Sequence, residues 1–332
     1  MPNPGGLPPV FLERLQRLFP ESLYGEVLTS FSVPKDIALR LQKPGYSRED
    51  LAGLLRKAGL EPEEIEELPF PAFFVSRETF RKLQEHPLYT QGTLYAQGLS
   101  SMLAVLVLAP RPGEKVLDMA AAPGSKTSLI AYLMKGEGEL TANDTHRGRF
   151  FRMKTILENQ GYRHIRMTLT AGEAFGRREP ESYDRVLLDA PCSGEARFQA
   201  DDPKSLGFWK MMKVRDLAKK QKRLFLSAFS ALKPGGVLVY STCTFSPEEN
   251  EGAVAAALKR IGSAAELEAV SLPPSVRVMA GLTSWENKVY PPALARACRI
   301  VPGPRTEGFF ILRVRKTGPW RWDRGFADEE MA

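Results

Sequence analysis

Cysteine and histidine are scarce in this 332-residue sequence, with three of each. Three cysteines cannot build a disulfide framework, and the histidines show no metal-ligand spacing, so we expect no metal site. No apolar run approaches the ~20 residues that a membrane helix needs. The N-terminus lacks the charged start and apolar core of a signal peptide. These absences predict a protein of the reducing cytoplasm, with no membrane partner.

Positive charge is in moderate excess, with a net charge of +7 and a pI of about 9.2. Such a balance favours polyanionic partners such as nucleic acid. The charge gathers in two expected helices and one expected strand: Arg147, Arg149, Arg152 and Lys154; Lys210, Lys213, Arg215, Lys219, Lys220, Lys222 and Arg223; Arg313, Arg315 and Lys316. Each cluster equally fits a solvated face that binds nothing.

The chain changes character near residue 85. Residues 1–85 indicate a small α+β unit, with helices over 9–19 and 47–60 and a strand over 37–42. Residues 86–318 alternate strands and helices, and 319–332 form a tail. The expected strands of this second unit are 115–120, 139–144, 165–170, 185–190, 236–242 and 308–316. Because alternation favours βαβ units, we predict an α/β, Rossmann-like fold with a mostly parallel central sheet.

A loop of small residues follows the first of these strands. Its sequence AAAPGSKT comprises Ala120, Ala121, Ala122, Pro123, Gly124, Ser125, Lys126 and Thr127. Small side chains let a ligand approach the backbone, and the next helix offers free amides to an anionic group. The loop lacks the spacing of a phosphate loop, and no G-x-G-x-x-G is present, which argues against nucleoside triphosphatases and dinucleotide enzymes.

An aspartate ends the second strand of the same unit. Asp144, in the segment ANDTHRGR, lies ~20 residues after the loop, where a carboxylate accepts hydrogen bonds from ribose hydroxyls. It could instead cap the helix that follows it. Together, the loop and Asp144 predict a nucleoside cofactor with a small anionic end, which S-adenosylmethionine matches.

Two of the three cysteines end apolar runs that we expect to be strands. Cys192 lies in RVLLDAPCSG and Cys243 in GVLVYSTCTF. The crevice of an open α/β sheet lies at the carboxyl ends of its strands, so both thiols would reach it. A buried cysteine often only fills space, and Cys298 is interpreted that way. A pair at two strand ends favours chemistry.

The segments AAAPGSKT, ANDTHRGR, DAPCSG and YSTCTFSPEENE resemble the RNA (cytosine-5-)-methyltransferases of the RsmB/RsmF/NOP2/NSUN type. The resemblance extends over most of the chain. It implies an S-adenosylmethionine-dependent methyltransferase fold and methylation of carbon 5 of cytosine in RNA. It also implies roles for the two thiols: Cys243 attacks carbon 6 of the base, and Cys192 completes product release.

The resemblance implies further site residues. Asp189 would contact the cytosine and lie beside the cofactor, and Lys126 would place a positive charge near that carboxylate and the thiols. Cofactor contacts would come from the loop 120–126, Asp144, Arg149 and Asp189. The family's aspartate after the third strand is missing from LTAGEAF, so either Glu173 substitutes for it in binding adenine or backbone groups hold the adenine.

The expected partner is therefore RNA, with ribosomal RNA favoured and transfer RNA second. A stacked base hides carbons 5 and 6, so the target cytosine must be unpaired or flipped out. The basic helices and the small N-terminal unit would hold the strand. Two alternatives remain at this point: a catalytically silent RNA-binding assembly factor and an exocyclic-amine methyltransferase, which needs no second cysteine. A monomer is the default expectation.

Overall fold

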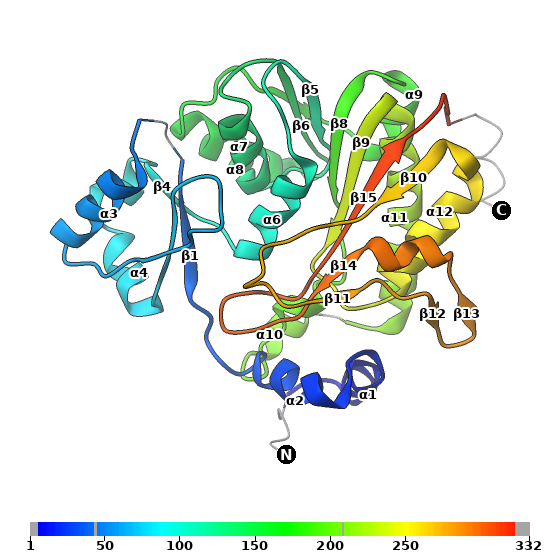
Figure 1. Ribbon diagram of the computed structural model, residues 1–332, viewed down its shortest axis with the longest axis horizontal. Coiled ribbons are helices and arrows are strands. Elements are labelled where there is room, and N and C mark those ends of the chain that lie inside the picture. The colour runs from blue at the N-terminus through cyan, green and yellow to red at the C-terminus, as the bar shows by residue number, and fades with distance from the viewer. Residues whose placement is uncertain (1–5, 43–44, 208, 323–332) are drawn as a thin grey trace.

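The computed structural model describes residues 6–42, 45–207 and 209–322 (Figure 1). Its centre is a nine-stranded sheet ordered β11-β14-β15-β9-β8-β5-β6-β7, with β10 also paired to β15. Five strands run parallel: β5 (Lys115–Asp118), β6 (Glu139–Asp144), β7 (Arg166–Leu169), β8 (Tyr183–Asp189) and β9 (Leu232–Thr242).

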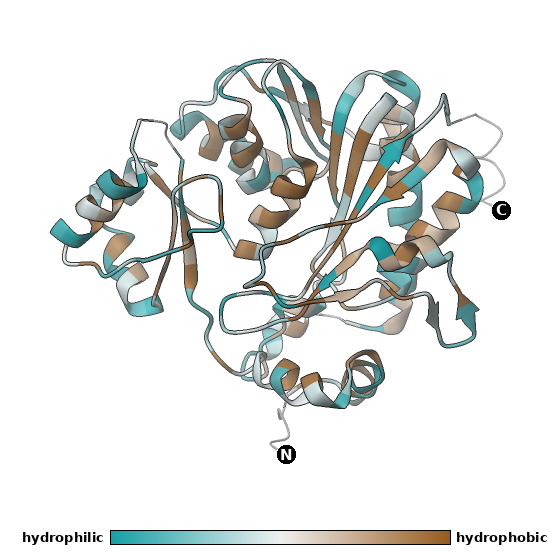
Figure 2. Cartoon of the chain, in the orientation of Figure 1, coloured by the Kyte–Doolittle hydropathy of each residue, from teal (hydrophilic) through white to brown (hydrophobic). Residues whose placement is uncertain are grey.

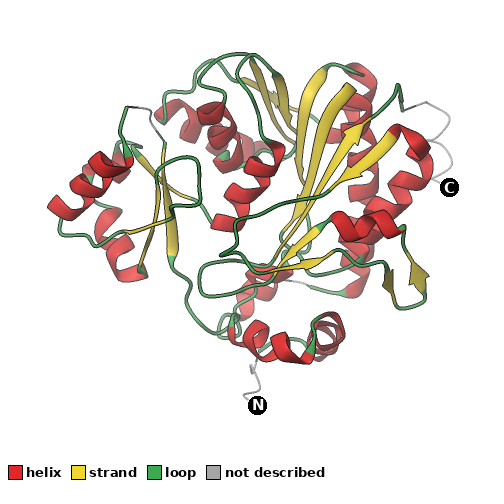
Figure 3. Ribbon diagram, viewed as in Figure 1, coloured by secondary structure: helices red, strands yellow, loops and turns green. Residues whose placement is uncertain are grey.

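The remaining strands of this sheet extend one side of it in antiparallel pairs. They are β10 (Ala265–Glu268), β11 (Val278–Ala280), β14 (Cys298–Ile300) and β15 (Phe309–Lys316). A short hairpin, β12 (Ser284–Trp285) and β13 (Lys288–Val289), projects from the body (Figure 3). The expected mostly parallel core is therefore present, within a mixed sheet.

Helices cover both faces of the sheet. On one face lie α6 (Leu99–Leu108), α7 (Ser125–Leu133) and α8 (Arg147–Asn159). On the other lie α9 (Phe175–Arg178), α11 (Met211–Ala231) and α12 (Ala253–Ile261), while α10 (Pro203–Leu206) lies near the lower edge in Figure 1. Short helical turns are η1 (Gly172–Ala174), η2 (Glu195–Arg197), η3 (Glu248–Gly252), η4 (Gly262–Ala264) and η5 (Pro292–Arg296).

Alternating side chains of the central strands fill two cores. Val186 and Leu188 of β8 pack in the core beneath α11, and Leu187 between them packs in the core beneath α6 and α7. Because both faces are covered, the central strands read as continuous apolar runs rather than as alternating ones. Hydrophobic residues, brown in Figure 2, accordingly concentrate in the central strands and in the helices packed on them.

The N-terminal residues split between two places. Helices α1 (Pro9–Leu18) and α2 (Glu21–Thr29) pack on the main body, where the Phe11 and Phe198 rings lie 5.1 Å apart. A separate four-stranded antiparallel sheet contains β1 (Ile37–Leu41), β2 (Glu63–Glu64), β3 (Ala72–Val75) and β4 (Leu94–Ala96). Its helices are α3 (Arg48–Lys57), α4 (Arg77–Leu83) and α5 (Pro87–Thr90).

Most predicted elements occur within a few residues of their expected bounds. A capping box begins α3, since the Ser47 hydroxyl accepts from Asp50 N and the Asp50 carboxylate accepts from Ser47 N. Helix α11 ends at Ala231, and β9 begins at Leu232, earlier than the strand expected over 236–242. The division at residue 85 stays a prediction, and β4 beyond it pairs with β1. Residues 323–332 of the predicted tail lie outside the described residues.

The basic residues of the last strand have partners within the fold. Arg313 and Arg315 both contact Glu268, each at 2.5 Å, and the Lys316 ammonium is buried and donates to backbone carbonyls.

Across the described ranges, no helix is long and apolar enough to cross a bilayer.

A buried arginine joins the small sheet to the main body. Arg40, on β1, is fully buried and donates from Nη2 to the Ser125 carbonyl at 3.0 Å and to Ser128 Oγ at 2.7 Å. Its other nitrogens donate to Gln97 Oε1 and Gln42 Oε1. Burial lowers its pKa to about 10. One side chain therefore connects the small sheet with the first turn of α7.

We predict that Arg40→Ala lowers the free energy of unfolding by about 3 kcal/mol, because several buried acceptors lose their donor at once. Urea denaturation measures this change. The exposed Arg81→Ala, on α4, should shift stability by less than ~0.5 kcal/mol. Equal effects of the two variants would show that the Arg40 contacts contribute no more to stability than a surface charge does.

Candidate active site

The small-residue loop lies where the sequence predicts a ligand. It leaves the carboxyl end of β5 and borders a cavity of about 330 Å³. The cavity is lined by Tyr95, Ala96, Gln97, Gly98, Ser101, Asp118, Ala120, Ala121, Ala122, Pro123, Ser125, Lys126, Arg149, Asp189, Arg197 and Glu307. Most of the expected cofactor-loop residues therefore meet at one opening.

Gly124 is the residue that lets the loop turn tightly into α7. Its φ of +103° lies in the left-handed region, and an added Cβ would come within 3.1 Å of Met153 Cγ on α8. A larger residue would therefore be strained and would press on the neighbouring helix. The turn positions the N-terminal amides of α7 at the cavity.

A nucleoside cofactor with an amino-acid end fits this cavity. The small alanine side chains leave room for a ligand close to the backbone, and the start of α7 supplies amides for a carboxylate. Among the described side chains, Asp118 Oδ1 is buried without a hydrogen-bond partner, although Thr127 Oγ1 donates to Oδ2 at 2.7 Å. The unpartnered oxygen on the cavity wall can accept from a ligand ammonium or amine.

Asp144 supports the loop from behind and is not among the residues that line the cavity. Its carboxylate accepts from Ala122 N at 3.3 Å and from His146 N at 2.8 Å, and its side chain is almost completely buried. The carboxylate thus holds the loop and the residue that precedes α8, whose N-cap is His146 itself. Its hydrogen bond to a ribose stays a prediction. Arg149 lies 3.7 Å from the Asp144 carboxylate and lines the cavity.

Lys126 and Asp189 form a partly buried ion pair across the site. The Lys126 ammonium donates to Asp189 Oδ2 at 2.7 Å, and Ser241 Oγ donates to Oδ1 at 2.8 Å. Asp189 ends β8 and Ser241 is its register partner on β9. The structure thus places the predicted positive charge at the predicted carboxylate, whose two oxygens both accept hydrogen bonds.

The two strand-end cysteines lie in contact. Cys192 Sγ and Cys243 Sγ are 3.4 Å apart, and both thiols are free. A hydrogen bond from Cys192, reinforced by the Arg197 cation, lowers the pKa of Cys243 against the opposing effect of burial. The same hydrogen bond, with burial and nearby carboxylates, raises the pKa of Cys192 well above its usual range. The first proton therefore leaves from Cys243.

Sequence reasoning missed Arg197, the cation of this site. It is the last residue of η2, five residues after Cys192, and lines the cavity together with Asp189. Negative charge around it, that of Cys243 first, raises its pKa. Its position shortly after DAPCSG was the available signal, but a single arginine in a loop carries no pattern of its own.

A buried hydrogen-bond network fixes the loops that carry the two thiols. Ser193 Oγ and Thr244 Oγ1 are 2.8 Å apart, which joins the residue after each cysteine. Glu195 accepts from Thr244 Oγ1 at 2.8 Å and from Phe245 N at 3.0 Å. Glu249 accepts from Ser193 N at 2.9 Å. Burial, with the Glu195 charge adding to it, raises the pKa of Glu249 to about 7.

Glu173 and Cys298 lie apart from this assembly. Glu173 sits in η1 and is not among the residues that line the cavity, so its adenine contact stays a prediction. The Cys298 thiol is buried on β14 and donates to the Val270 carbonyl, as packing predicts. Within the described residues, no group of three or more His, Cys, Asp or Glu side chains is arranged to hold a metal ion.

Comparison with known proteins gives several matches. Residues 105–315 match the family described as 16S rRNA methyltransferase RsmB/F. A tRNA (cytosine(49)-C(5))-methyltransferase of Pyrococcus abyssi is 42% identical over 229 residues, covering 69% of this chain and 72% of the relative. The ribosomal RNA small subunit methyltransferase F of Vibrio parahaemolyticus is 35% identical over 316 residues, covering 93% of this chain and 63% of the relative. This chain thus spans less than two thirds of that relative's length.

Solved structures share the fold. A methyltransferase homolog protein from Pyrococcus horikoshii aligns with a TM-score of 0.75 and 29% identity, over 93% of this chain and all of its own. NSun6 from the same organism aligns with a TM-score of 0.78 and 24% identity, over 95% of this chain and 100% of its own. These alignments confirm the predicted methyltransferase fold with its additional N-terminal α+β part.

The raised pKa of Glu249 predicts a pH-dependent stability. The folded state keeps its proton up to about pH 7, whereas the unfolded carboxyl loses it near pH 4.5. Folding stability therefore falls as pH rises through that window. The free energy of unfolding of Glu249→Gln, measured by urea denaturation, should not fall in this way. Its difference from that of the unsubstituted protein should therefore grow by about 2 kcal/mol between roughly pH 5 and pH 8.

The exposed Glu266→Gln, on β10, serves as the control and should show no such pH-dependent difference. A constant offset between Glu249→Gln and the unsubstituted protein at all pH values would contradict the proposed burial of a titrating carboxyl.

Proposed function

We propose that this chain, which belongs to the RsmB/F family of RNA cytosine-C5 methyltransferases, methylates carbon 5 of a cytosine in ribosomal RNA. Membership places it among the S-adenosylmethionine-dependent enzymes and confirms the resemblance noted in its motifs. The observation that carries the proposed chemistry is the contact of two free thiols, 3.4 Å apart, with the pKa of one lowered and that of the other raised.

The chemistry requires a nucleophile, because carbon 5 of cytosine is unreactive in its aromatic ring. The Cys243 thiolate adds to carbon 6, and the electron pair displaced from the 5,6 double bond makes carbon 5 nucleophilic. S-adenosylmethionine, when bound, supplies the methyl group that carbon 5 takes up. Arg197 stabilises the thiolate, because a nearby cation favours the charged form of a thiol.

Release needs a proton acceptor for carbon 5. Removing that proton lets the electrons return to the ring and expels Cys243 as a thiolate. Cys192 is in contact with Cys243 and is the candidate for this step. While Cys243 is bonded to carbon 6, the hydrogen bond and charge of Cys243 that raise the pKa of Cys192 are gone, so Cys192 loses its proton to solvent. As a thiolate it then accepts the carbon 5 proton while Cys243 leaves as a thiolate, which restores the starting pair.

Asp189 and Lys126 hold the base for this attack. Asp189 reaches the cavity from the end of β8, next to the thiols, and its carboxylate is oriented by Lys126 and Ser241. A carboxyl here can pair with the polar edge of cytosine, and the ammonium of Lys126 balances its charge. The cofactor would lie against the loop 120–126 and Arg149, with Asp144 fixing the loop.

Two RNA classes are candidates. Ribosomal RNA is supported by the family description and by the alignment with the ribosomal RNA small subunit methyltransferase F of Vibrio parahaemolyticus over 93% of this chain. Transfer RNA is supported by the higher identity, 42%, to a tRNA methyltransferase over a shorter segment. Bisulfite sequencing of total RNA from cells with and without the protein separates them. Loss of 5-methylcytosine from tRNA alone would reject the ribosomal assignment.

The free thiols bear on the cellular location of the protein. The two contacting thiols stay free only where disulfides do not persist, which favours a reducing cytoplasm. A monomer remains our prediction for the oligomeric state. The small sheet and the basic helix α8 are proposed to position the RNA strand, since Arg149 of that helix lines the cofactor cavity.

We predict opposite outcomes for the two cysteines. Cys243→Ala should abolish methyl transfer and any covalent RNA adduct, because no other thiol ends β9. Cys192→Ala should accumulate an adduct that survives denaturation, because attack proceeds and release fails. Denaturing gel electrophoresis with labelled RNA measures both. An adduct in Cys243→Ala, or a freely dissociating Cys192→Ala, would reject these roles.

We predict that Asp144→Ala weakens S-adenosylmethionine binding roughly tenfold, because Ala122 N and His146 N lose their acceptor and the loop loosens. Isothermal titration calorimetry measures the affinity. The conservative Asp144→Asn keeps one acceptor oxygen and should fall between. An unchanged affinity in Asp144→Ala would show that the loop needs no support from this carboxylate.

A further inference from the structure

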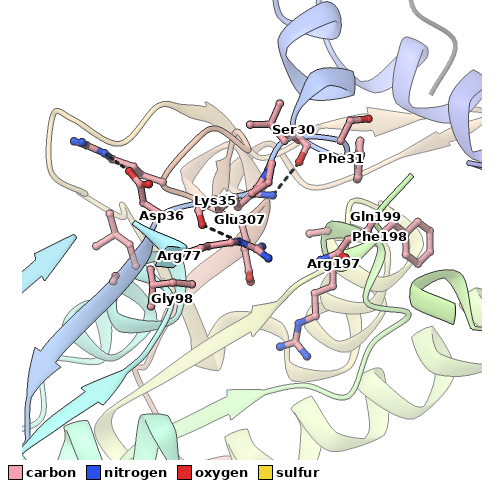
Figure 4. Close-up of a pocket in the computed structure, with 18 of the residues that line it drawn as sticks. Ser30, Phe31, Lys35, Asp36, Arg77, Gly98, Arg197, Phe198, Gln199 and Glu307 are labelled. Carbon is pink, nitrogen blue, oxygen red and sulfur yellow. Dashed lines mark hydrogen bonds and ion pairs between the residues drawn. The ribbon is translucent and has the colours of Figure 1, made fainter. Parts of the chain in front are cut away.

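A second cavity, of about 410 Å³, adjoins the first (Figure 4). It lies between the connector 30–38, which links α2 to β1, the start of α4, and the segment 196–199 that follows Cys192. Five residues line both cavities: Ala96, Gln97, Gly98, Arg197 and Glu307. The two cavities therefore share a border formed by these five residues.

Among the described residues, two cations on its wall form no ion pair within 4 Å, although the Glu307 carboxylate acts electrostatically on the first of them, Lys35. The Lys35 ammonium donates to the Ser30 carbonyl at 3.1 Å, and Arg77 Nε donates to the Lys35 carbonyl at 3.4 Å. Arg305, by contrast, pairs with Asp36 and Glu63. Figure 4 shows Lys35 and Arg77 from one side and Arg197 from the other around the same space.

The cavity also offers an apolar surface. Val33 is 47% exposed and lines it, although its neighbours Phe31 and Phe198 are buried beneath. Cationic groups beside an exposed apolar side chain suit a nucleotide, whose phosphate seeks donors and whose base seeks a flat apolar or guanidinium contact. Glu307 and Asp201 also line it, so an anionic ligand must be directed toward the Arg77 side.

We propose that this second cavity binds the nucleotide adjoining the target cytosine in single-stranded RNA, with its phosphate on Arg77 and Lys35. The inference rests on the proposed function, because it takes the first cavity to hold the reacting base and the cofactor. A flipped base stays joined to its neighbours, so the next phosphodiester must lie at the mouth of the catalytic cavity. Arg197 lines both cavities, so in this arrangement it would lie near both the thiols and the RNA strand.

Arg77 allows a clean test. It begins α4, is exposed, and lines only the second cavity. Arg81 is a matched control, because it is an exposed arginine on the same helix that lines neither cavity. Arg77→Ala and Arg81→Ala each remove one positive charge from α4. A difference in RNA affinity between them would therefore arise from the position of Arg77 at the cavity.

The probe is a short fluorescein-labelled oligocytidylate, followed by fluorescence anisotropy at several salt concentrations. Arg77→Ala should weaken binding roughly tenfold, as loss of one charged hydrogen bond predicts. The slope of log affinity against log salt should also fall in magnitude by about 0.7, the value for one phosphate on a single strand. Arg81→Ala should change neither. Affinity for S-adenosylmethionine, by calorimetry, should stay the same in both variants.

Equal oligonucleotide binding by the two variants would overturn the proposal. Weaker S-adenosylmethionine binding by Arg77→Ala would also overturn it, because the cavity would then serve the cofactor. Anisotropy does not depend on methyl transfer. If the unsubstituted protein methylates no RNA and Cys192→Ala traps no adduct, the proposed function fails, while the binding comparison still decides whether this cavity holds a nucleotide.

Discussion

The parallel pairing of β8 with β9 is the constraint on which the site depends. Asp189 and Ser241 are register partners at the carboxyl ends of these two strands. Each strand then releases a loop with a cysteine three or two residues beyond its partner, and the two sulfur atoms meet at 3.4 Å. A register shift of one residue would turn every side chain of β9 to the other face. The core between the helices thus fixes the distance between the thiols.

Charge in this buried region is balanced locally. Asp189 pairs with Lys126, the Cys243 sulfur faces Arg197, and Glu195 and Glu249 are surrounded by hydroxyl and amide donors. An unpaired charge would be costly in such surroundings, so each group depends on its partner. The same surroundings separate the pKa values of two identical thiols. Chemistry that needs one thiolate and one thiol follows from where the cations and carboxylates lie.

The small sheet is coupled to the site through its backbone and through one side chain. Arg40 donates from β1 to the first turn of α7, and the connector before β1 forms one wall of the second cavity. A strand of RNA held by the small sheet would therefore act on the same turn that borders the cofactor cavity. This arrangement gives the N-terminal residues a physical connection to catalysis, beyond added surface for binding.

The sequence by itself determined which strand ends carry the site residues: the loop after β5, Asp144 at the end of β6, and the cysteines after β8 and β9. Local patterns carry this information, because apolar periodicity and turn residues define where each strand stops. Tertiary structure decided the rest. Arg197 and Glu249 gain their roles from groups 46 and 56 residues away, Cys243 and Ser193 respectively. Arg313 and Arg315 of β15 pair with Glu268, and Lys316 pairs with Glu181. Such outcomes depend on which side chains meet across the fold and how deeply they are buried, and no local pattern records either.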